Sequence, residues 1–292
     1  MVFVPIDAEA RPAHVHLTVA DLERSLRFYR DLLGLRVLDR HDGAVALAAR
    51  GSSRPHVLLV ERPGARPQPR GTRGLYHFAL LLPSRRDLAR ALLRLVEAGW
   101  PLQGASDHRV SEALYLADPD GHGIELYADR PRSQWPRRDG ELAMATLALD
   151  IDGLVSEVGE EGGPVTGLPE GATMGHFHLH VADLDRATAF YHDVLGFDVM
   201  ARYGDSAVFL AAGGYHHHLG LNVWAGRGAP PPPPDAAQLV GFAFAVPPAE
   251  VARLAGRLAD AGCVVQEFEE EAGSGLATRD PDGNRVELVM GG

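Results

Sequence analysis

The sequence predicts an α+β protein in which four strand–helix–three-strand (βαβββ) modules form two tandem domains with cupped, mixed sheets. Three observations lead to this class. The chain has 292 residues, which suits two domains of ordinary size. Motifs of its first half return in its second half. Within each half, a strand pattern, one amphipathic helix and several short strands occur twice in succession.

The repeat is the firmest of these observations. Residues 21–34 (DLERSLRFYRDLLG) return as residues 183–196 (DLDRATAFYHDVLG), which lie 162 positions later. The turn sequence Asp-Pro-Asp-Gly at 118–121 returns at the same spacing, at 280–283. A spacing shared by separate motifs indicates that the second half is a structural copy of the first.

The first module covers about residues 12–62. His14–Val19 alternates polar and apolar residues as a strand does. Asp21 is a typical N-cap for the helix that follows, whose apolar residues share one face, and Gly34 is a typical residue to end it. Short strands are then expected at 36–39, 45–49 and 57–61.

The second module covers about residues 74–130 and completes a predicted N-terminal domain, residues 1–130. Its first strand is expected at 76–82 and its helix from Ser84 to Gly99. A hairpin closes it, with strands at 113–117 and up to Leu126 around the Asp-Pro-Asp-Gly turn.

The rest of the chain repeats this plan. An irregular connector, residues 131–173, precedes a predicted C-terminal domain, residues 174–292. Its two modules cover about residues 174–226 and 239–290.

Composition excludes several functions. The formal charge of −11 argues against nucleic acid as a partner. A single cysteine, Cys263, allows no internal disulfide and indicates a reducing, cytoplasmic environment. We expect no signal peptide and no membrane association, because the N-terminus lacks a basic segment with an apolar core and no apolar run approaches the length of a membrane span.

One carboxylate stands in an unusual position. Glu125 lies between Ile124 and Leu126 on a predicted strand, so its side chain points to the opposite face of the sheet. That face must be wet, or it must supply a cation or a metal ion. The fourth module has Glu287 at the equivalent position.

Histidines mark the first strands of the modules. His14, His77 and His176 occupy one aligned position in the first three modules, and Gly241 occupies it in the fourth. Two histidines and one carboxylate typically hold Fe(II) or Mn(II) and leave adjacent metal positions open. Only the second module offers both kinds of ligand, so the residues leave the third ligand open between His14 and His176. The module of Glu287 has no first-strand histidine, so Glu287 is interpreted as a relic of the repeat or a hydrogen-bonded inner-face residue.

Further polar groups accompany this ligand set. His108 and Tyr115 lie just upstream of Glu125, and a His-Tyr-Glu group is typical of a metal-centred acid–base site. Three histidines at 216–218 are expected on the last strand of the third module, with His217 facing away from its two neighbours. The alternative for these three is an exposed polar edge.

These residues resemble the vicinal oxygen chelate superfamily. The segments HVHLTVADLERSLRFYRDLLGL and GHFHLHVADLDRATAFYHDVLGF look like its first-strand and helix segments. The run from His108 through Leu114-Tyr115 and Asp118-Pro119 to Glu125 resembles the motif of its extradiol ring-cleaving dioxygenases, of the bacterial catechol 2,3-dioxygenase kind. Ser106 departs from that motif. The likeness covers nearly the whole chain and implies two domains of the glyoxalase/extradiol dioxygenase type.

The resemblance also implies a site. It favours His176 over His14 as the third ligand, beside His77 and Glu125, with Fe(II) as the metal and Mn(II) as the alternative. It also implies that the second and third modules pair with each other across the halves. His217 would deprotonate the substrate and later return the proton, whereas His108 and Tyr115 would hold its oxygens.

The implied activity is Fe(II)-dependent extradiol cleavage of a catechol by O₂ to a hydroxymuconic semialdehyde, in a cytoplasmic enzyme compatible with a homo-oligomer. One alternative is a glyoxalase-type metal isomerase or thiol transferase. Another is a non-catalytic small-molecule binding or resistance protein of the same fold.

Overall fold

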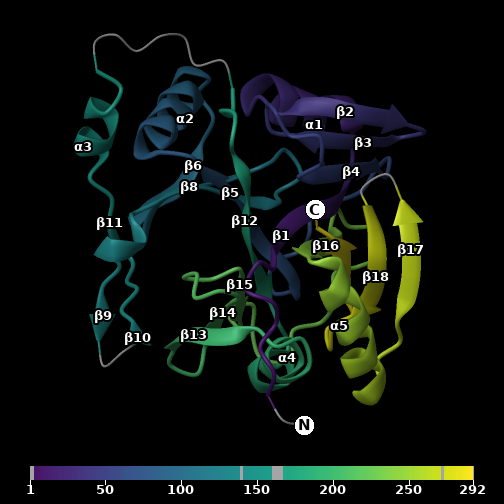
Figure 1. Cartoon of the computed structure of the whole chain (residues 1–292). Coiled ribbons are helices and arrows are strands. Elements are labelled where there is room, and N and C mark those ends of the chain that lie inside the picture. Colours follow the sequence, from purple (N-terminus) through teal and green to yellow (C-terminus); the bar gives the residue numbers. More distant parts are fainter. Residues whose placement is uncertain (1–2, 139–140, 160–166, 271–272, 292) are drawn as a thin grey trace.

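Two large mixed sheets dominate the protein (Figure 1). The computed structural model describes residues 3–138, 141–159, 167–270 and 273–291. The sheets meet where β1 lies against β12. Each sheet contains two modules, and the first strands of those two modules pair antiparallel at its centre.

The sheet that carries the candidate site joins the second and third modules. Its strand order is β11 (Leu147–Ala148), β6 (Leu102–Asp107), β7 (Ser111–Ala117), β8 (Gly123–Asp129), β5 (Gly74–Leu82), β12 (Thr173–His180), β15 (Leu219–Asn222), β14 (Ala207–Ala211) and β13 (Asp198–Tyr203). We call it the site sheet.

The other sheet joins the first and fourth modules. Its strand order is β17 (Gln266–Glu270), β18 (Gly273–Arg279), β19 (Arg285–Met290), β16 (Leu239–Val246), β1 (Arg11–Val19), β4 (Val57–Glu61), β3 (Ala44–Ala48) and β2 (Arg36–His41). We call it the companion sheet.

This topology confirms the predicted pairing of the second and third modules across the halves. The α+β class with four modules is confirmed as well. The division of the chain into domains 1–130 and 174–292 stays a prediction, since each sheet takes one module from either half.

The α-helices are α1 (Leu22–Leu26), which continues into the π-helix η1 (Arg27–Leu32), α2 (Arg85–Glu97), α3 (Ile151–Ser156), α4 (Leu184–Ala189), which continues into the π-helix η3 (Phe190–Val194), and α5 (Pro248–Asp260). Four of the helices pack against strands of the sheets, and α3 packs against α2. The predicted caps form, since Asp21 and Ser84 each accept a backbone N–H from three residues further on. Within the described residues, none of the helices combines the length and hydrophobicity needed to cross a membrane.

The repeated motifs hold neighbouring modules together. The Tyr29 hydroxyl, on the first helix, donates to Asp118 in the turn of the second module over 2.9 Å. Tyr191 donates to Asp280 over 2.8 Å in the same way. The sheets therefore pair modules across the halves, whereas these buried hydrogen bonds pair modules within each half.

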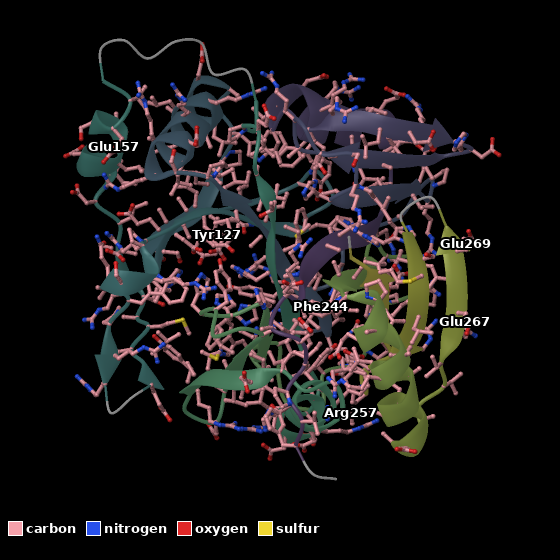
Figure 2. All side chains as sticks on the ribbon, viewed as in Figure 1. Tyr127, Glu157, Phe244, Arg257, Glu267 and Glu269 are labelled. Carbon is pink, nitrogen blue, oxygen red and sulfur yellow. The ribbon has the colours of Figure 1, made fainter. Side chains whose placement is uncertain are left out.

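Aromatic packing fills the space between the sheets. Phe177 of β12 packs against Phe242 and Phe244 of β16, with ring centroids 4.9 and 5.7 Å away. Figure 2 shows Phe244 near the middle of the molecule, whereas Glu267 and Glu269 of β17 lie at its edge. Burial of such large rings stabilises the joining of the sheets.

The connector is more regular than the sequence predicts. It contains η2 (Arg132–Gln134), β9 (Arg137–Arg138), β10 (Glu141–Leu142), β11 and α3. Leu147 and Ala148 pair with Asp107 and Ser106, so the connector supplies the edge strand of the site sheet. The prediction of an irregular segment was wrong because such a short strand is ordered by its partner rather than by its own propensity.

Candidate metal centre and active site

Three buried side chains converge on one point of the site sheet. Glu125 on β8 pairs across to Ala79 on β5, and His176 on β12 pairs with Ala79 from the other side. His77 lies two residues before Ala79. The Glu125 Oε2 atom is 3.0 Å from Nε2 of His176 and 3.1 Å from Nε2 of His77, and the two Nε2 atoms are 3.3 Å apart.

The chemistry of these donors fits a divalent metal ion. Two imidazole nitrogens and one carboxylate oxygen form a 2-His-1-carboxylate set, which suits Fe(II) or Mn(II). Burial alone would raise the pKa of Glu125, but the neighbouring His176 and His77 hold it well below its usual range. Burial lowers the pKa of His77. An ionised carboxylate beside neutral imidazoles is the protonation state that metal binding requires.

The structure places His176, and not His14, beside His77 and Glu125. His14 lies in the companion sheet, where its Nε2 is 3.1 Å from Oε2 of Glu287. Glu287 also accepts from Nε of Arg285 over 2.5 Å, which agrees with a hydrogen-bonded inner-face residue.

We call His77, Glu125 and His176 the three-donor cluster. A cavity of about 430 Å³ borders this cluster. His108, Tyr115 and His217 all line it, together with His77 and Glu125. The structure thus brings every residue expected to act on the substrate to one cavity.

Hydrogen bonds define the tautomer of His108. Its Nδ1 is 2.8 Å from the carbonyl oxygen of Ala145, which can only accept, so Nδ1 carries the proton. In neutral His108 the bare Nε2 then accepts from the Tyr115 hydroxyl over 2.6 Å. Burial, followed by the charge of Glu125, raises the pKa of Tyr115 well above its usual value. Tyr115 is therefore a neutral phenol whose oxygen can still accept a hydrogen bond inside the cavity.

A second chain of hydrogen bonds reaches His217. Nε2 of His216 is 2.9 Å from Oδ1 of Asp129, which accepts, so that nitrogen carries the proton. In neutral His216 the bare Nδ1 accepts from Nδ1 of His217 over 2.8 Å. This leaves Nε2 of His217 unprotonated. Burial lowers the pKa of His217 well below its usual value, so this nitrogen is a free base near neutral pH.

The three adjacent histidines differ in one respect from the prediction. They precede β15 instead of lying on it, because side-chain bonds bend the chain here. His218 accepts the backbone N–H of Ala212 through Nδ1, and His216 binds Asp129. The expected opposite orientation of His217 nevertheless holds, since it alone of the three lines the cavity.

Sequence reasoning missed four contributors to the site. Asp129 orients His216, and Ala145 orients His108 through its carbonyl oxygen. Tyr76 and Trp224 form part of the cavity wall although both are about half exposed. Asp129 follows Glu125 by four residues, and the alternation of Leu142–Leu149 could have suggested a strand. Nothing in the sequence singles out the carbonyl of Ala145.

Comparison with known proteins agrees with this geometry. The family model of the Glyoxalase/Bleomycin resistance protein/Dioxygenase superfamily matches residues 11–126 and again residues 173–288. A catechol-2,3-dioxygenase of Bacillus subtilis (strain 168) is 50% identical over 268 residues, which cover 90% of this chain and 93% of that protein. Metapyrocatechase 2 of Cupriavidus necator is 31% identical over 137 residues, which cover 44% of this chain and 41% of that protein.

The fold is shared with solved structures of low sequence identity. A Bacillus subtilis structure superposes on 98% of this chain and 86% of its own with a TM-score of 0.69, at 14% identity. Since the family model matches well over half of the chain, and in both halves, the resemblance found in the sequence is confirmed: the chain belongs to the Glyoxalase/Bleomycin resistance protein/Dioxygenase superfamily.

Proposed function

We propose that this protein is an extradiol dioxygenase that cleaves a catechol ring beside its two hydroxyl groups. The observation that carries the proposal is the three-donor cluster of His77, Glu125 and His176 at the end of a cavity lined by His108, Tyr115 and His217. The 50% identity to a protein named catechol-2,3-dioxygenase supports the same reaction. Both atoms of O₂ enter the product, a hydroxymuconic semialdehyde, so the reaction consumes no external reductant.

His77, Glu125 and His176 would hold the metal ion, which we propose to be Fe(II). When bound, the ion lowers the pKa of the catechol hydroxyls and passes electron density between the ring and O₂.

The side chains around the cluster move and hold protons. Nε2 of His217 would accept a catechol proton and return it as the ring opens, since its tautomer leaves that atom free. The Tyr115 hydroxyl, with its proton directed to His108, would accept a hydrogen bond from a substrate hydroxyl. We further propose that the protein acts in the cytoplasm, in keeping with its lack of paired cysteines.

The test is oxygen uptake with catechol after anaerobic loading with Fe(II), while a yellow ring-fission product is followed. We expect O₂ consumption and a yellow product in equal amounts. Stoichiometric bound metal without O₂ uptake would contradict the proposal and favour a metal isomerase or thiol transferase. Absence of metal binding would favour a non-catalytic binding protein.

A His217→Asn variant separates proton transfer from metal binding. We expect it to retain its iron but to lose kcat by on the order of 10²–10⁴, the usual contribution of a positioned acid–base group. Exposed His41→Asn provides a matched control with unchanged kcat. Unchanged turnover of the His217 variant would remove His217 from the mechanism.

A further inference from the structure

The cavity exceeds the needs of an unsubstituted catechol. Its volume of about 430 Å³ falls in the range of pockets that enclose drug-sized organic molecules. One six-membered ring with two hydroxyl groups would fill only the part beside the three-donor cluster. The remaining volume must be occupied by a substituent or by water.

The walls of this remaining volume carry no compensating charge. In the part of the chain that the structure describes, Glu125 is the only Asp, Glu, Lys or Arg that lines the cavity. Arg130 binds the cavity-lining Val110 through its backbone N–H, but its guanidinium is bound to Asp107 over 2.9 Å and to Glu112 over 3.0 Å. A carboxylate on the substrate ring would therefore lose its hydration without gaining a cation. The net charge of −11 also disfavours the approach of an anion.

Aromatic side chains dominate the mouth of the cavity. Tyr76 and Trp224 are 42% and 50% exposed, which is high for such large rings, and their centroids lie 5.6 Å apart in an edge-to-face arrangement. Behind them, His178 lies 5.2 Å from Tyr76, 5.3 Å from Trp224 and 5.6 Å from Phe209. An additional ring placed here would make favourable aromatic contacts and cover the exposed apolar surface.

We propose that the preferred substrate is an uncharged catechol with an apolar, ring-sized substituent, which lies against Tyr76 and Trp224. This inference rests on the proposed function and specifies its substrate class. Trp224 is a specificity-determining residue in this arrangement. Its backbone N–H binds Asn222 Oδ1 over 2.9 Å, and this bond fixes the start of the loop in which Trp224 lies.

The test compares kcat/KM for the iron-loaded protein with catechol, 3- and 4-phenylcatechol, and 3,4-dihydroxybenzoate. We expect the better phenylcatechol to exceed catechol by roughly tenfold, as for a modest gain of apolar contact. The carboxylated compound should fall below catechol by roughly a hundredfold or more, since its charge has no partner in the cavity.

The outcomes separate this inference from the proposed function. Cleavage of catechol with equal or better use of the carboxylated compound would overturn the inference and leave the dioxygenase assignment standing. Rejection of both phenylcatechols would also overturn it. Failure to cleave any of the catechols would contradict the proposed function, and this inference with it.

Two substitutions of Trp224 sharpen the test. Trp224→Ala should lower the ratio of phenylcatechol to catechol kcat/KM by roughly tenfold. Trp224→Arg should raise the relative kcat/KM for 3,4-dihydroxybenzoate, because it places a cation at the mouth of the cavity. Phe3→Ala is the matched control, an exposed aromatic that lies outside the cavity and stacks on His192. This wall is not the substituent site if Trp224→Ala leaves the ratio of phenylcatechol to catechol kcat/KM unchanged and Trp224→Arg leaves the relative kcat/KM for 3,4-dihydroxybenzoate unchanged.

Discussion

The site sheet and the companion sheet are copies of one architecture, yet among the described residues the three-donor cluster occurs in the site sheet alone. His176 and His14 both pair with an alanine of the neighbouring strand, and Glu125 and Glu287 pair with that same alanine from its other side. Each sheet therefore holds one histidine and one glutamate in the same register. The two sheets differ in the residues around this histidine–glutamate pair.

Among the described residues, the companion sheet has other residue types where three cavity-lining groups of the site sheet stand. Gly241 replaces His77. Ala277 pairs with Glu287 where Tyr115 pairs with Glu125. His56 in the companion sheet and His218 in the site sheet occupy equivalent positions, and each accepts a backbone N–H. The residue before this histidine is Pro55 in the companion sheet and His217 in the site sheet. The backbone-binding histidine is thus shared by both sheets, whereas His77, Tyr115 and His217, which line the cavity, are replaced by Gly241, Ala277 and Pro55.

A glycine and a larger residue exchange strands between the two sheets, and this exchange determines which positive group stands beside each glutamate. In the site sheet His77 stands beside Gly123, where a Cβ would approach the Tyr76 carbonyl oxygen to 2.1 Å and the Cβ of His77 to 3.1 Å. In the companion sheet the glycine is on the other strand: Gly241 stands beside Arg285, and a Cβ there would meet the Cβ of Arg285 at 3.1 Å. The guanidinium of Arg285 binds Glu287 and so supplies the positive charge that a metal ion would supply to Glu125.

The largest expected effect distinguishes the two glutamates. Glu125→Ala should weaken metal binding by at least about a hundredfold, more than the loss of an outer-shell partner costs, and should abolish turnover. Glu287→Ala should retain one metal ion per chain and its activity. Metal content measured by mass spectrometry after gel filtration, together with O₂ uptake, checks both variants. Normal iron in Glu125→Ala, or lost iron in a folded Glu287→Ala, would contradict the difference drawn between the sheets.

A second metal ion can be introduced by reversing the exchange. Gly241→His combined with Arg285→Gly should raise the capacity from one metal ion per chain to two, because an imidazole then joins His14 and Glu287 in place of the guanidinium. Titration with Co(II), followed by its absorption spectrum, measures the stoichiometry without reliance on activity. Gly241→His alone is the control and should still bind one ion, since Arg285 keeps its contact with Glu287. A folded double variant with one ion would show that Arg285 is not what prevents binding.

The sequence predicted most of the arrangement of residues and little of their orientation. The repeat at 162 residues, the hairpin that carries Glu125 and the four modules follow from spacing and alternation, which are local properties of the chain. The pairing of the second and third modules came from the family resemblance, because periodicity does not specify which sheet edges meet.

The remaining features depend on contacts between distant segments. The bend at His216 depends on Asp129, 87 residues away, and the tautomer of His108 depends on the carbonyl of Ala145. The exchange between Gly241 and Arg285 appears only when the strands are in register. Such features can be identified only from the three-dimensional structure, because neither residue of each pair has a sequence pattern that predicts its partner.

The smallest expected effect concerns the hydrogen bonds that tie modules within each half. Asp118 Oδ2 receives Tyr29 as its donor among the described residues, whereas Asp280 Oδ2 receives both Tyr191 and the side-chain amide of Asn284. Tyr29→Phe should therefore lower the free energy of unfolding by about 1–3 kcal/mol, the cost of an unsatisfied buried group. Tyr191→Phe should cost less, because Asn284 remains as a donor.

Urea unfolding at pH 7, with exposed Tyr203→Phe as the control, measures this difference. Burial raises the pKa of Asp118, and the Tyr29 hydroxyl partly counteracts this by stabilising the ionised carboxylate. The cost of Tyr29→Phe should consequently shrink as the pH falls through that raised pKa, since a protonated Asp118 has less need of the donor. A cost equal to that of Tyr191→Phe, or one that grows with acidification, would show that this hydrogen bond does not hold the first module to the second.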